Sequence, residues 1–305
     1  MHQFKRRYFE TKFGARFPRL NYTINIDLDD RVAYFETPKV ACTSIKAYMI
    51  ARAGARLPDF KMPQNIHDRK KSPLVELGNL NEPRALEVML GSFKRFSFVR
   101  NPYTRILSAY LDKIVQNDHE RARMLPIFGF EQTDRPSFLE FLRALEQIPN
   151  HRRDIHFVSQ ADLLMVDLID YTRLGRMETF DQDFHLIREK LFQDKTAKIS
   201  SNAGRHHATG AADNIATHYG QEETDMVQAL FAADFKLFGY STDIAQATAP
   251  NTPPQHLTAQ ACAMRYLDGV APARVKEDLT IRRNDRLLPK SAIAELHALD
   301  PALLA

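Results

Sequence analysis

The sequence predicts an α/β fold in which a parallel sheet is flanked by helices. Two apolar segments rich in β-forming residues, 31–36 (RVAYFE) and 95–99 (RFSFV), each lead through a turn into a segment with helical periodicity. Strands and helices alternate up to about residue 240, which is typical of a parallel sheet covered on both faces. With 305 residues, 44% of them hydrophobic, the chain can bury a sizeable core.

Local signals place the remaining elements. The predicted helices, in order, are 43–53, 84–91, 101–115, 136–147, one that begins near Thr179, and 221–237. Asn101 can cap the third of these helices, and Pro102 suits its first position. Residues 55–83 contain four prolines and predict an irregular excursion between two helices.

The composition changes near residue 245. We expect one main domain over residues 1–245 and a proline-rich linker over 246–256. Short helical patterns over 257–305 predict a small, mostly helical C-terminal appendage, whose role the sequence does not reveal.

The charge balance and the cysteine count exclude several classes of protein. A net charge of +4 suits anionic ligands but is too small to indicate a nucleic-acid binder. Two cysteines provide neither a disulfide framework nor zinc-ligand spacing. The basic N-terminus lacks the apolar stretch of a signal peptide, and no run of 18 apolar residues occurs. We therefore expect a cytoplasmic protein without a transmembrane segment. Peripheral membrane contact through a basic amphipathic N-terminus is the alternative.

The first strand–turn–helix contains a predicted anion loop, residues 38–44 (PKVACTS). A tight turn before a helix directs backbone N–H groups at one point, and the helix dipole adds positive potential there. Thr43 and Ser44 add hydroxyl donors, and Lys39 adds a full charge. The glycines and the G-K-[ST] ending of an ATP-binding loop are missing, which disfavours nucleoside-triphosphate chemistry. A plain strand-to-helix connection with a buried Cys42 remains the alternative.

The second strand–turn–helix, residues 96–110, predicts another anion site. Arg100 ends the strand, and Ser108 lies two turns into the next helix. An arginine and a hydroxyl so placed can hold a phosphate by charge-assisted hydrogen bonds. Ligands of open α/β sheets bind at the carboxyl ends of the strands, so two such sites suit a ligand with two anionic groups. The alternative is a surface Arg100 that pairs with Asp112 or with a helix end.

Together, PKVACTSIK and FVRNPYTRILSAYLDKI resemble the paired cofactor motifs of sulfotransferases that use 3′-phosphoadenosine-5′-phosphosulfate (PAPS), above all the carbohydrate sulfotransferases acting on chondroitin- and dermatan-type glycans. Weaker similarity continues at 156–164, 171–184 and 234–240, so the resemblance covers about residues 30–240. It implies the sulfotransferase fold, with a P-loop-like sheet, and transfer of a sulfuryl group to a hydroxyl by in-line displacement.

The resemblance also implies roles for individual residues. The 5′-phosphosulfate would be bound by Lys39, Val40, Ala41, Cys42, Thr43 and Ser44. The 3′-phosphate would be bound by Arg100 and Ser108, and Arg205 in the loop 202–210 would make a third contact. Lys39 would stabilise the charge that develops on the bridging oxygen, so that no metal is required.

The sequence offers several candidates for the base that takes the proton from the acceptor hydroxyl. His67 is preferred, because related enzymes place a substrate-facing histidine in this stretch, and Arg69, Lys70 and Lys71 beside it could hold an acidic glycan. His156 comes second and Glu36 third. The alternatives are a solvated His67 beside a solvated charge run, a His156 packed on the core, and a Glu36 in an ion pair.

Other features leave questions open. The adjacent His206 and His207 lack the further ligands of a metal site. Glu178 matches a family position without an evident role, and a helix cap is its simple interpretation. The expected acceptor is a glycan or a glycolipid, and the oligomeric state is open. A nucleotide-dependent kinase and a non-catalytic polyanion-binding protein are the competing functions.

Overall fold

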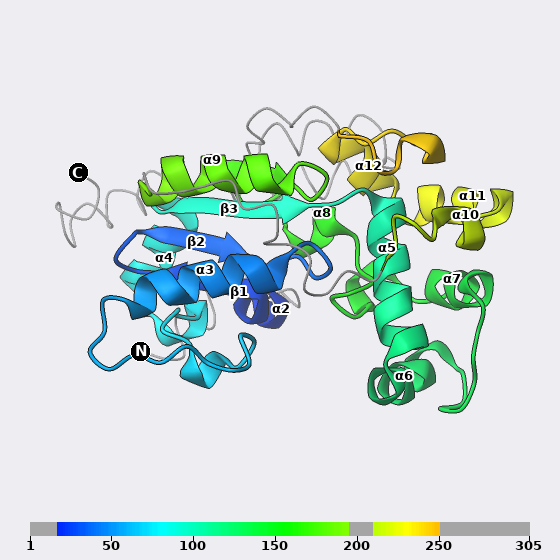
Figure 1. The fold of residues 1–305 in the computed structure, drawn as a ribbon, viewed down its shortest axis with the longest axis horizontal. Coiled ribbons are helices and arrows are strands. Elements are labelled where there is room, and N and C mark those ends of the chain that lie inside the picture. Colours follow the sequence, from blue (N-terminus) through cyan, green and yellow to red (C-terminus); the bar gives the residue numbers. More distant parts are fainter. Residues whose placement is uncertain (1–16, 195–209, 251–305) are drawn as a thin grey trace.

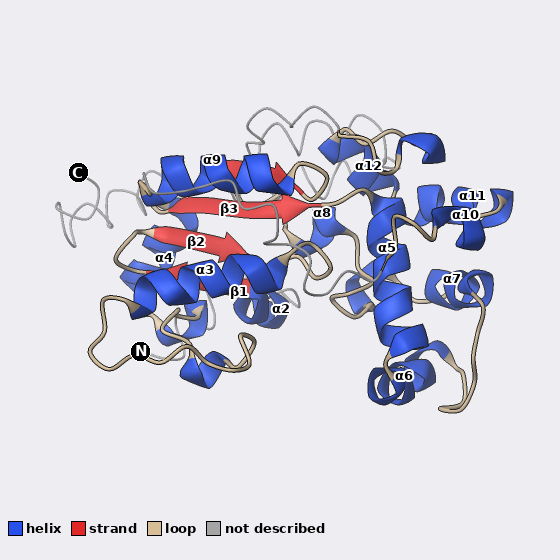
Figure 2. Cartoon of the chain, in the orientation of Figure 1, coloured by secondary structure: helices blue, strands red, loops and turns tan. Residues whose placement is uncertain are grey.

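The structure is a computed structural model that describes residues 17–194 and 210–250 (Figure 1). Its centre is a four-stranded sheet in the order β1-β2-β3-β4 (Figure 2). The strands are β1 (Ile24–Asp27), β2 (Val32–Phe35), β3 (Lys94–Val99) and β4 (Arg173–Arg176). The pairs β2–β3 and β3–β4 are parallel, as the sequence predicts.

The edge strand β1 corrects the expectation of a wholly parallel sheet, because it pairs with β2 in antiparallel register. Only a four-residue turn, 28–31, separates the two strands, and parallel neighbours need a crossover of a dozen or more residues. The sequence prediction had no strand before residue 31. It also placed no strand between residue 147 and Thr179, where β4 lies.

Helices cover both faces of the sheet, as predicted. Val32 and Tyr34 of β2 face a cluster formed with α3 (Cys42–Gly54) and α9 (Phe180–Phe192). The alternate residues Ala33 and Phe35 face the opposite cluster, which includes side chains of α4 (Glu82–Leu90). All four of these β2 side chains are at most 1% exposed, so β2 lies in the middle of the core.

The other helices include four that the sequence did not predict, over residues 17–23, 118–124, 160–163 and 215–218, and the rest differ from the prediction mainly at their ends. They are α2 (Phe17–Thr23), α5 (Pro102–Tyr110), α6 (Asp118–Met124), α7 (Phe138–Glu146), α8 (Gln160–Leu163), α10 (Ile215–His218), α11 (Gln221–Leu230) and α12 (Ala232–Phe238). The predicted helix 101–115 is α5 followed by a π-helix, Leu111–Gln116. The predicted helix 221–237 is divided into α11 and α12 at Phe231, whose ψ of 25° leaves the helical range. Asn101 caps α5 by accepting the N–H of Tyr103, as predicted.

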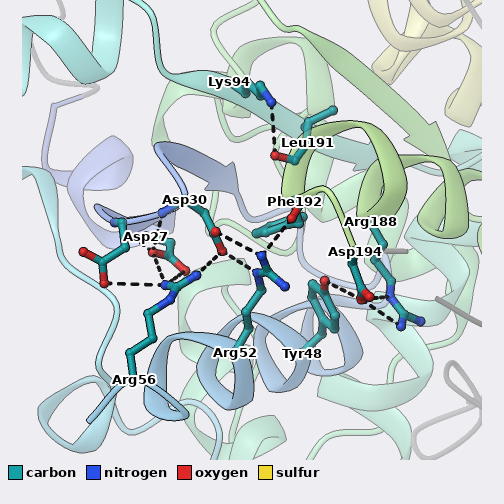
Figure 3. Close-up of polar contacts among 11 residues, drawn as sticks. Asp27, Asp30, Tyr48, Arg52, Arg56, Lys94, Arg188, Leu191, Phe192 and Asp194 are labelled. Atoms are coloured by element: carbon teal, nitrogen blue, oxygen red, sulfur yellow. Dashed lines mark hydrogen bonds and ion pairs between the residues drawn. The ribbon is translucent and has the colours of Figure 1, made fainter. Parts of the chain in front are cut away.

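A polar network holds the C-terminal half of α3 at the end of the sheet away from the anion loop (Figure 3). Arg52 of α3 and Arg56, two residues after the helix ends, both bind Asp30 in the β1–β2 turn, and Arg56 also binds Asp27. Arg52 further donates to the carbonyl of Phe192 at the end of α9, 2.7 Å away. The network therefore fixes α3, and with it the loop from which α3 begins.

Two expectations concern other parts of the chain. In 17–194 and 210–250, no helix combines the length and the apolar character of a membrane span. The predicted appendage 257–305, and most of the predicted linker 246–256, lie outside the described residues.

Candidate active site at the ends of β2 and β3

The anion loop has the backbone of a glycine-containing turn, although it contains no glycine. Lys39 has a φ of 67° and Ala41 a φ of 52°, both in the left-handed region that residues with a side chain rarely adopt. Such strain persists only where the surroundings impose it, and it is concentrated at ligand sites. Ala41 precedes α3 without a capping side chain, and the first turn of α3 holds no acidic residue. The loop thus presents the amino end of a 13-residue helix to an anion.

Arg105 of α5 links this loop to the segment 155–158. Its guanidinium donates to three carbonyls, those of Pro38 (3.3 Å), Val158 (2.8 Å) and Ile155 (3.2 Å). The residue is 1% exposed, and burial lowers the pKa of Arg105 to about 10. Sequence analysis missed this arginine, because only the fold brings those carbonyls around it.

Arg100 joins the two predicted anion elements. Its Nη1 donates to the carbonyl of Lys39 at 3.1 Å, and its Nε donates to Thr104 Oγ1 at 3.0 Å. Burial lowers the pKa of Arg100, an effect that Glu178 opposes. The predicted partner Ser108 is 2% exposed within α5, and the hydroxyl that accepts from Arg100 Nε is that of Thr104. The role of Ser108 at a phosphate stays a prediction.

Gln160 fixes the backbone of Arg100. Its side-chain oxygen accepts the Arg100 N–H at 2.9 Å, and its amide nitrogen donates to the Arg100 carbonyl at 2.8 Å. Asp234, which is fully buried, accepts the backbone N–H groups of Gln160 and Ala161, each at 2.8 Å. The stretches that contain Gln160 and Asp234 were among the weaker similarities in the sequence. Here they hold the second anion element in place.

Lys39 is paired through its side chain. Its Nζ lies 3.2 Å from Asp112 Oδ2 in the π-helix, and its side chain is only 12% exposed. Burial lowers the pKa of Lys39, and the charge of Asp112 opposes this effect. The same carboxylate contacts Lys113 at 3.3 Å. Asp112 was predicted only as an alternative partner for Arg100.

His67 lies beside the anion loop, where it completes a chain of polar contacts. His67 Nε2 is 3.2 Å from Thr43 Oγ1, and Nδ1 is 2.6 Å from Lys46 Nζ. Lys46 donates in turn to Glu36 Oε2 at 2.8 Å, and both Lys46 and Glu36 are buried. Glu36 is thus in an ion pair, the alternative that the sequence left open. Burial raises the pKa of Cys42 to about 12, which keeps this thiol protonated.

His156 is half-buried and is bound to a carboxylate. Its Nδ1 lies 2.6 Å from Asp154 Oδ1, which also accepts the backbone N–H of His156 at 3.0 Å. Burial alone would raise the pKa of Asp154, but the hydrogen bond and charge of His156 outweigh it, so that this pKa is lowered. Ile155 and Val158, whose carbonyls bind Arg105, flank His156 on either side.

The three basic residues after His67 differ in their surroundings. Arg69 donates to Glu76 at 2.7 Å and to the carbonyl of Ile24 at 2.7 Å, so its guanidinium supports β1. Lys70 is exposed, and Lys71, 73% exposed, lies 3.8 Å from Asp68. Lys70 and Lys71 are therefore better placed than Arg69 to meet a soluble acceptor, and that role stays a prediction for all three.

Glu178 has a structural role rather than that of a cap on its own helix. Its carboxylate accepts the backbone N–H of Asn101 at 2.7 Å and the hydroxyl of Tyr240 at 2.9 Å. It thereby ties the end of β4 to the start of α5. Arg205, His206 and His207 lie outside the described residues. Among the residues that are described, no three His, Cys, Asp or Glu side chains gather to hold a metal ion. The expectation that no metal is required stays a prediction.

Most of the chain is similar in sequence to known proteins. A sequence profile described as "Sulfotransferase family" matches residues 22–241. Carbohydrate sulfotransferase 10 of Xenopus laevis is 29% identical over 233 residues, which cover 69% of this chain and 65% of the relative. Human carbohydrate sulfotransferase 9 is 23% identical over 243 residues, covering 72% of this chain and 53% of the relative. No solved structure gives a significant match.

Proposed function

The chain belongs to the sulfotransferase family, and from this premise we propose that it transfers the sulfuryl group of PAPS to a hydroxyl of a carbohydrate or glycoconjugate. The chain spans about 65% of the length of the Xenopus relative, so its activity is inferred from its own site as well as from the similarity. The observation that carries the proposal is the contact between Arg100 and the carbonyl of Lys39, which unites two cationic strand ends in one site.

The residues present fit the donor. When bound, PAPS supplies the sulfuryl group and a phosphate leaving group. The strained backbone of Lys39 and Ala41 turns the loop toward an anion at the start of α3. Thr43 accepts a hydrogen bond from His67 in one tautomer of that ring and keeps its own hydroxyl proton to donate. Lys39 is a buried cation that can bind the bridging oxygen where charge develops.

Arg100 suits the second anionic group. Its guanidinium has five N–H donors. One donor on Nη1 binds the carbonyl of Lys39, and the donor on Nε binds Thr104 Oγ1. The backbone of Arg100 is fixed on both sides by Gln160, so the side chain starts from a rigid point. Preorganised donors of this kind contribute to catalysis because they need no reorganisation during the reaction. The carbohydrate acceptor is supported by the names of the relatives, which are carbohydrate sulfotransferases.

Thermal unfolding with PAP, the desulfated product, tests the proposal, with ATP plus Mg²⁺ as the parallel sample. A ligand at about 100 times its Kd adds roughly 2.7 kcal/mol of stability. We expect stabilisation by PAP and none by ATP–Mg²⁺, followed by transfer of ³⁵S from labelled PAPS to members of a carbohydrate panel. Stabilisation by ATP–Mg²⁺ alone would favour a kinase. Salt-sensitive binding of polyanions without any effect of PAP would favour a non-catalytic polyanion-binding protein.

A further inference from the structure

We propose that the two candidate histidines hold opposite tautomers and have different roles: His156 takes the proton of the acceptor hydroxyl on Nε2, whereas His67 donates a hydrogen bond from Nε2. The inference rests on the proposed sulfuryl transfer and assigns its base. It depends on the partner of each Nδ1 atom, which is the Asp154 carboxylate for His156 and the Lys46 ammonium for His67.

The carboxylate beside His156 fixes its tautomer. An ionised carboxylate only accepts hydrogen bonds, so Nδ1 of His156, 2.6 Å from Asp154 Oδ1, must carry a proton. The remaining ring nitrogen, Nε2, then has a free lone pair in the neutral ring. Asp154 Oδ1 also accepts the backbone N–H of His156, so ring and backbone are held by one oxygen. A carboxylate that orients a histidine in this way prepares it to act as a base.

The ammonium beside His67 has the opposite effect. A lysine ammonium is a donor with no acceptor, so Nδ1 of His67, 2.6 Å from Lys46 Nζ, must accept. The proton of the neutral ring is then on Nε2, where Thr43 Oγ1 lies 3.2 Å away. Glu36 holds Lys46 in place at 2.8 Å, and its other oxygen is 4.0 Å from Nδ1. The opposite tautomer would direct an N–H at an ammonium.

Both histidines are connected to the anion loop. His67 contacts Thr43 at the start of α3. Arg105 binds the carbonyl of Pro38, just before Lys39, and also the carbonyls of Ile155 and Val158 that flank His156. Charged groups near His156 include Asp154 on its own loop, Arg105 of α5, which binds the neighbouring carbonyl of Ile155, and Arg123 of α6, whose charge lowers the pKa of Asp154.

The proposed step conserves atoms and charge. The acceptor oxygen forms a bond to sulfur, while the bond between sulfur and the bridging oxygen breaks and its electron pair leaves on the phosphate. The hydroxyl proton passes to Nε2 of His156, and Asp154 stabilises the resulting imidazolium. His67 donates from Nε2 to Thr43 Oγ1, which leaves the hydroxyl proton of Thr43 to bind an oxygen of the transferring group, and Lys39 stabilises the leaving oxygen. His156 later releases its proton to solvent.

Glutamine variants separate the two roles, because an amide can donate a hydrogen bond but cannot act as a base. We expect His156→Gln to lower kcat by about 10²- to 10⁴-fold, the usual effect of losing a general base. His67→Gln should keep kcat within about tenfold, whereas His67→Ala, which loses the donor, should lose on the order of 10²-fold. Stabilisation by PAP should survive in all three variants. Retained kcat in His156→Gln, or a loss in His67→Gln equal to that in His67→Ala, would overturn the assignment.

The wild-type protein provides a second test that is independent of turnover. Long-range ¹H–¹⁵N correlation spectra of the imidazole rings report which nitrogen is protonated. We expect protonated Nδ1 in His156 and protonated Nε2 in His67, and the reverse pattern would refute the proposal. In Asp154→Asn, where the amide no longer fixes a proton on Nδ1, the same spectra should show that His156 has lost its preference for protonated Nδ1. If wild-type protein shows neither stabilisation by PAP nor sulfate transfer, the proposed function itself fails, whatever the spectra show.

Discussion

The ammonium of Lys39 lies 3.2 Å from the carboxylate of Asp112, which belongs to the π-helix that follows α5. Lys39 lies in the loop that follows β2, and Asp112 lies in the helical segment that continues α5 after β3. An anion entering the loop must compete with this carboxylate for the lysine. At the same time, Asp112 stabilises the charge of a buried lysine whose pKa burial would otherwise lower further.

Lys39→Ala should abolish most of the turnover without unfolding the protein. Removing one donor that stabilises transition-state charge costs about 10²- to 10³-fold in kcat. The measurements are kcat for sulfate transfer and the Tm of the variant. Because α3 is also held by Arg52 and Arg56, we expect the fold to persist. An active Lys39→Ala enzyme would show that the lysine does not stabilise the bridging oxygen.

Asp112→Asn should move the basic limb of kcat/KM for PAPS to lower pH. Burial lowers the pKa of Lys39 and Asp112 raises it, so loss of the carboxylate lets Lys39 lose its proton earlier as the pH rises. At neutral pH the variant should also bind PAP more tightly, because a competing negative charge is absent. Glu189→Gln, which removes an exposed carboxylate of α9, is the matched control. An unchanged basic limb would mean that the essential acid is another group.

Arg105→Met should destabilise the protein by about 3 kcal/mol or more, because it leaves three carbonyls without their buried donor. The free energy of unfolding in urea measures the loss. Arg152→Met replaces an exposed arginine close in sequence to Ile155 and Val158, and should change stability by no more than about 0.5 kcal/mol. Equal effects of the two substitutions would show that the three carbonyls do not depend on Arg105.

Asp30→Asn should destabilise the protein at neutral pH and much less under acid conditions. Burial alone would raise the pKa of Asp30, but the hydrogen bonds and charges of Arg52 and Arg56 lower it below 3.8. A carboxyl group with a lowered pKa stabilises the fold above its ordinary pKa, and this stabilisation is lost as the pH falls through the lowered value. The difference between wild type and variant should therefore persist from pH 7 to about pH 4 and shrink below it. Urea unfolding at several pH values tests this, and a constant difference contradicts it.

Replacing both Lys70 and Lys71 by alanine should raise KM for an acidic glycan several-fold and leave stabilisation by PAP unchanged. Both side chains are exposed close to His67, so their attraction for a polyanion is screened by salt. The effect should therefore fade at high ionic strength. Lys61→Ala, at another exposed lysine of the same excursion, is the control. No change in KM would remove these two lysines from the acceptor site.

The sequence by itself determined the two strand–turn–helix units, because their signals are local. Alternating and helical apolar patterns placed β2, α3, β3 and α5, and the Asn101–Pro102 pair marked the start of α5. Lys39 and Arg100 followed from their positions at the ends of strands. The similarity to sulfotransferases depended on these same residues, and the family match over 22–241 confirms it.

Only the tertiary structure decided how these residues are held. The antiparallel β1, the left-handed backbone of Lys39 and Ala41, and the pairing of Lys39 with Asp112 depend on contacts between segments that no local pattern connects. The same holds for the histidines: residue type allows each neutral ring two tautomers. The group in contact with Nδ1 selects the tautomer. For His67 that group is Lys46, which the fold brings to the ring, and for His156 it is Asp154 of the same loop. A hydrogen bond needs its partner within about 3 Å, and for most of this site only folding supplies that proximity.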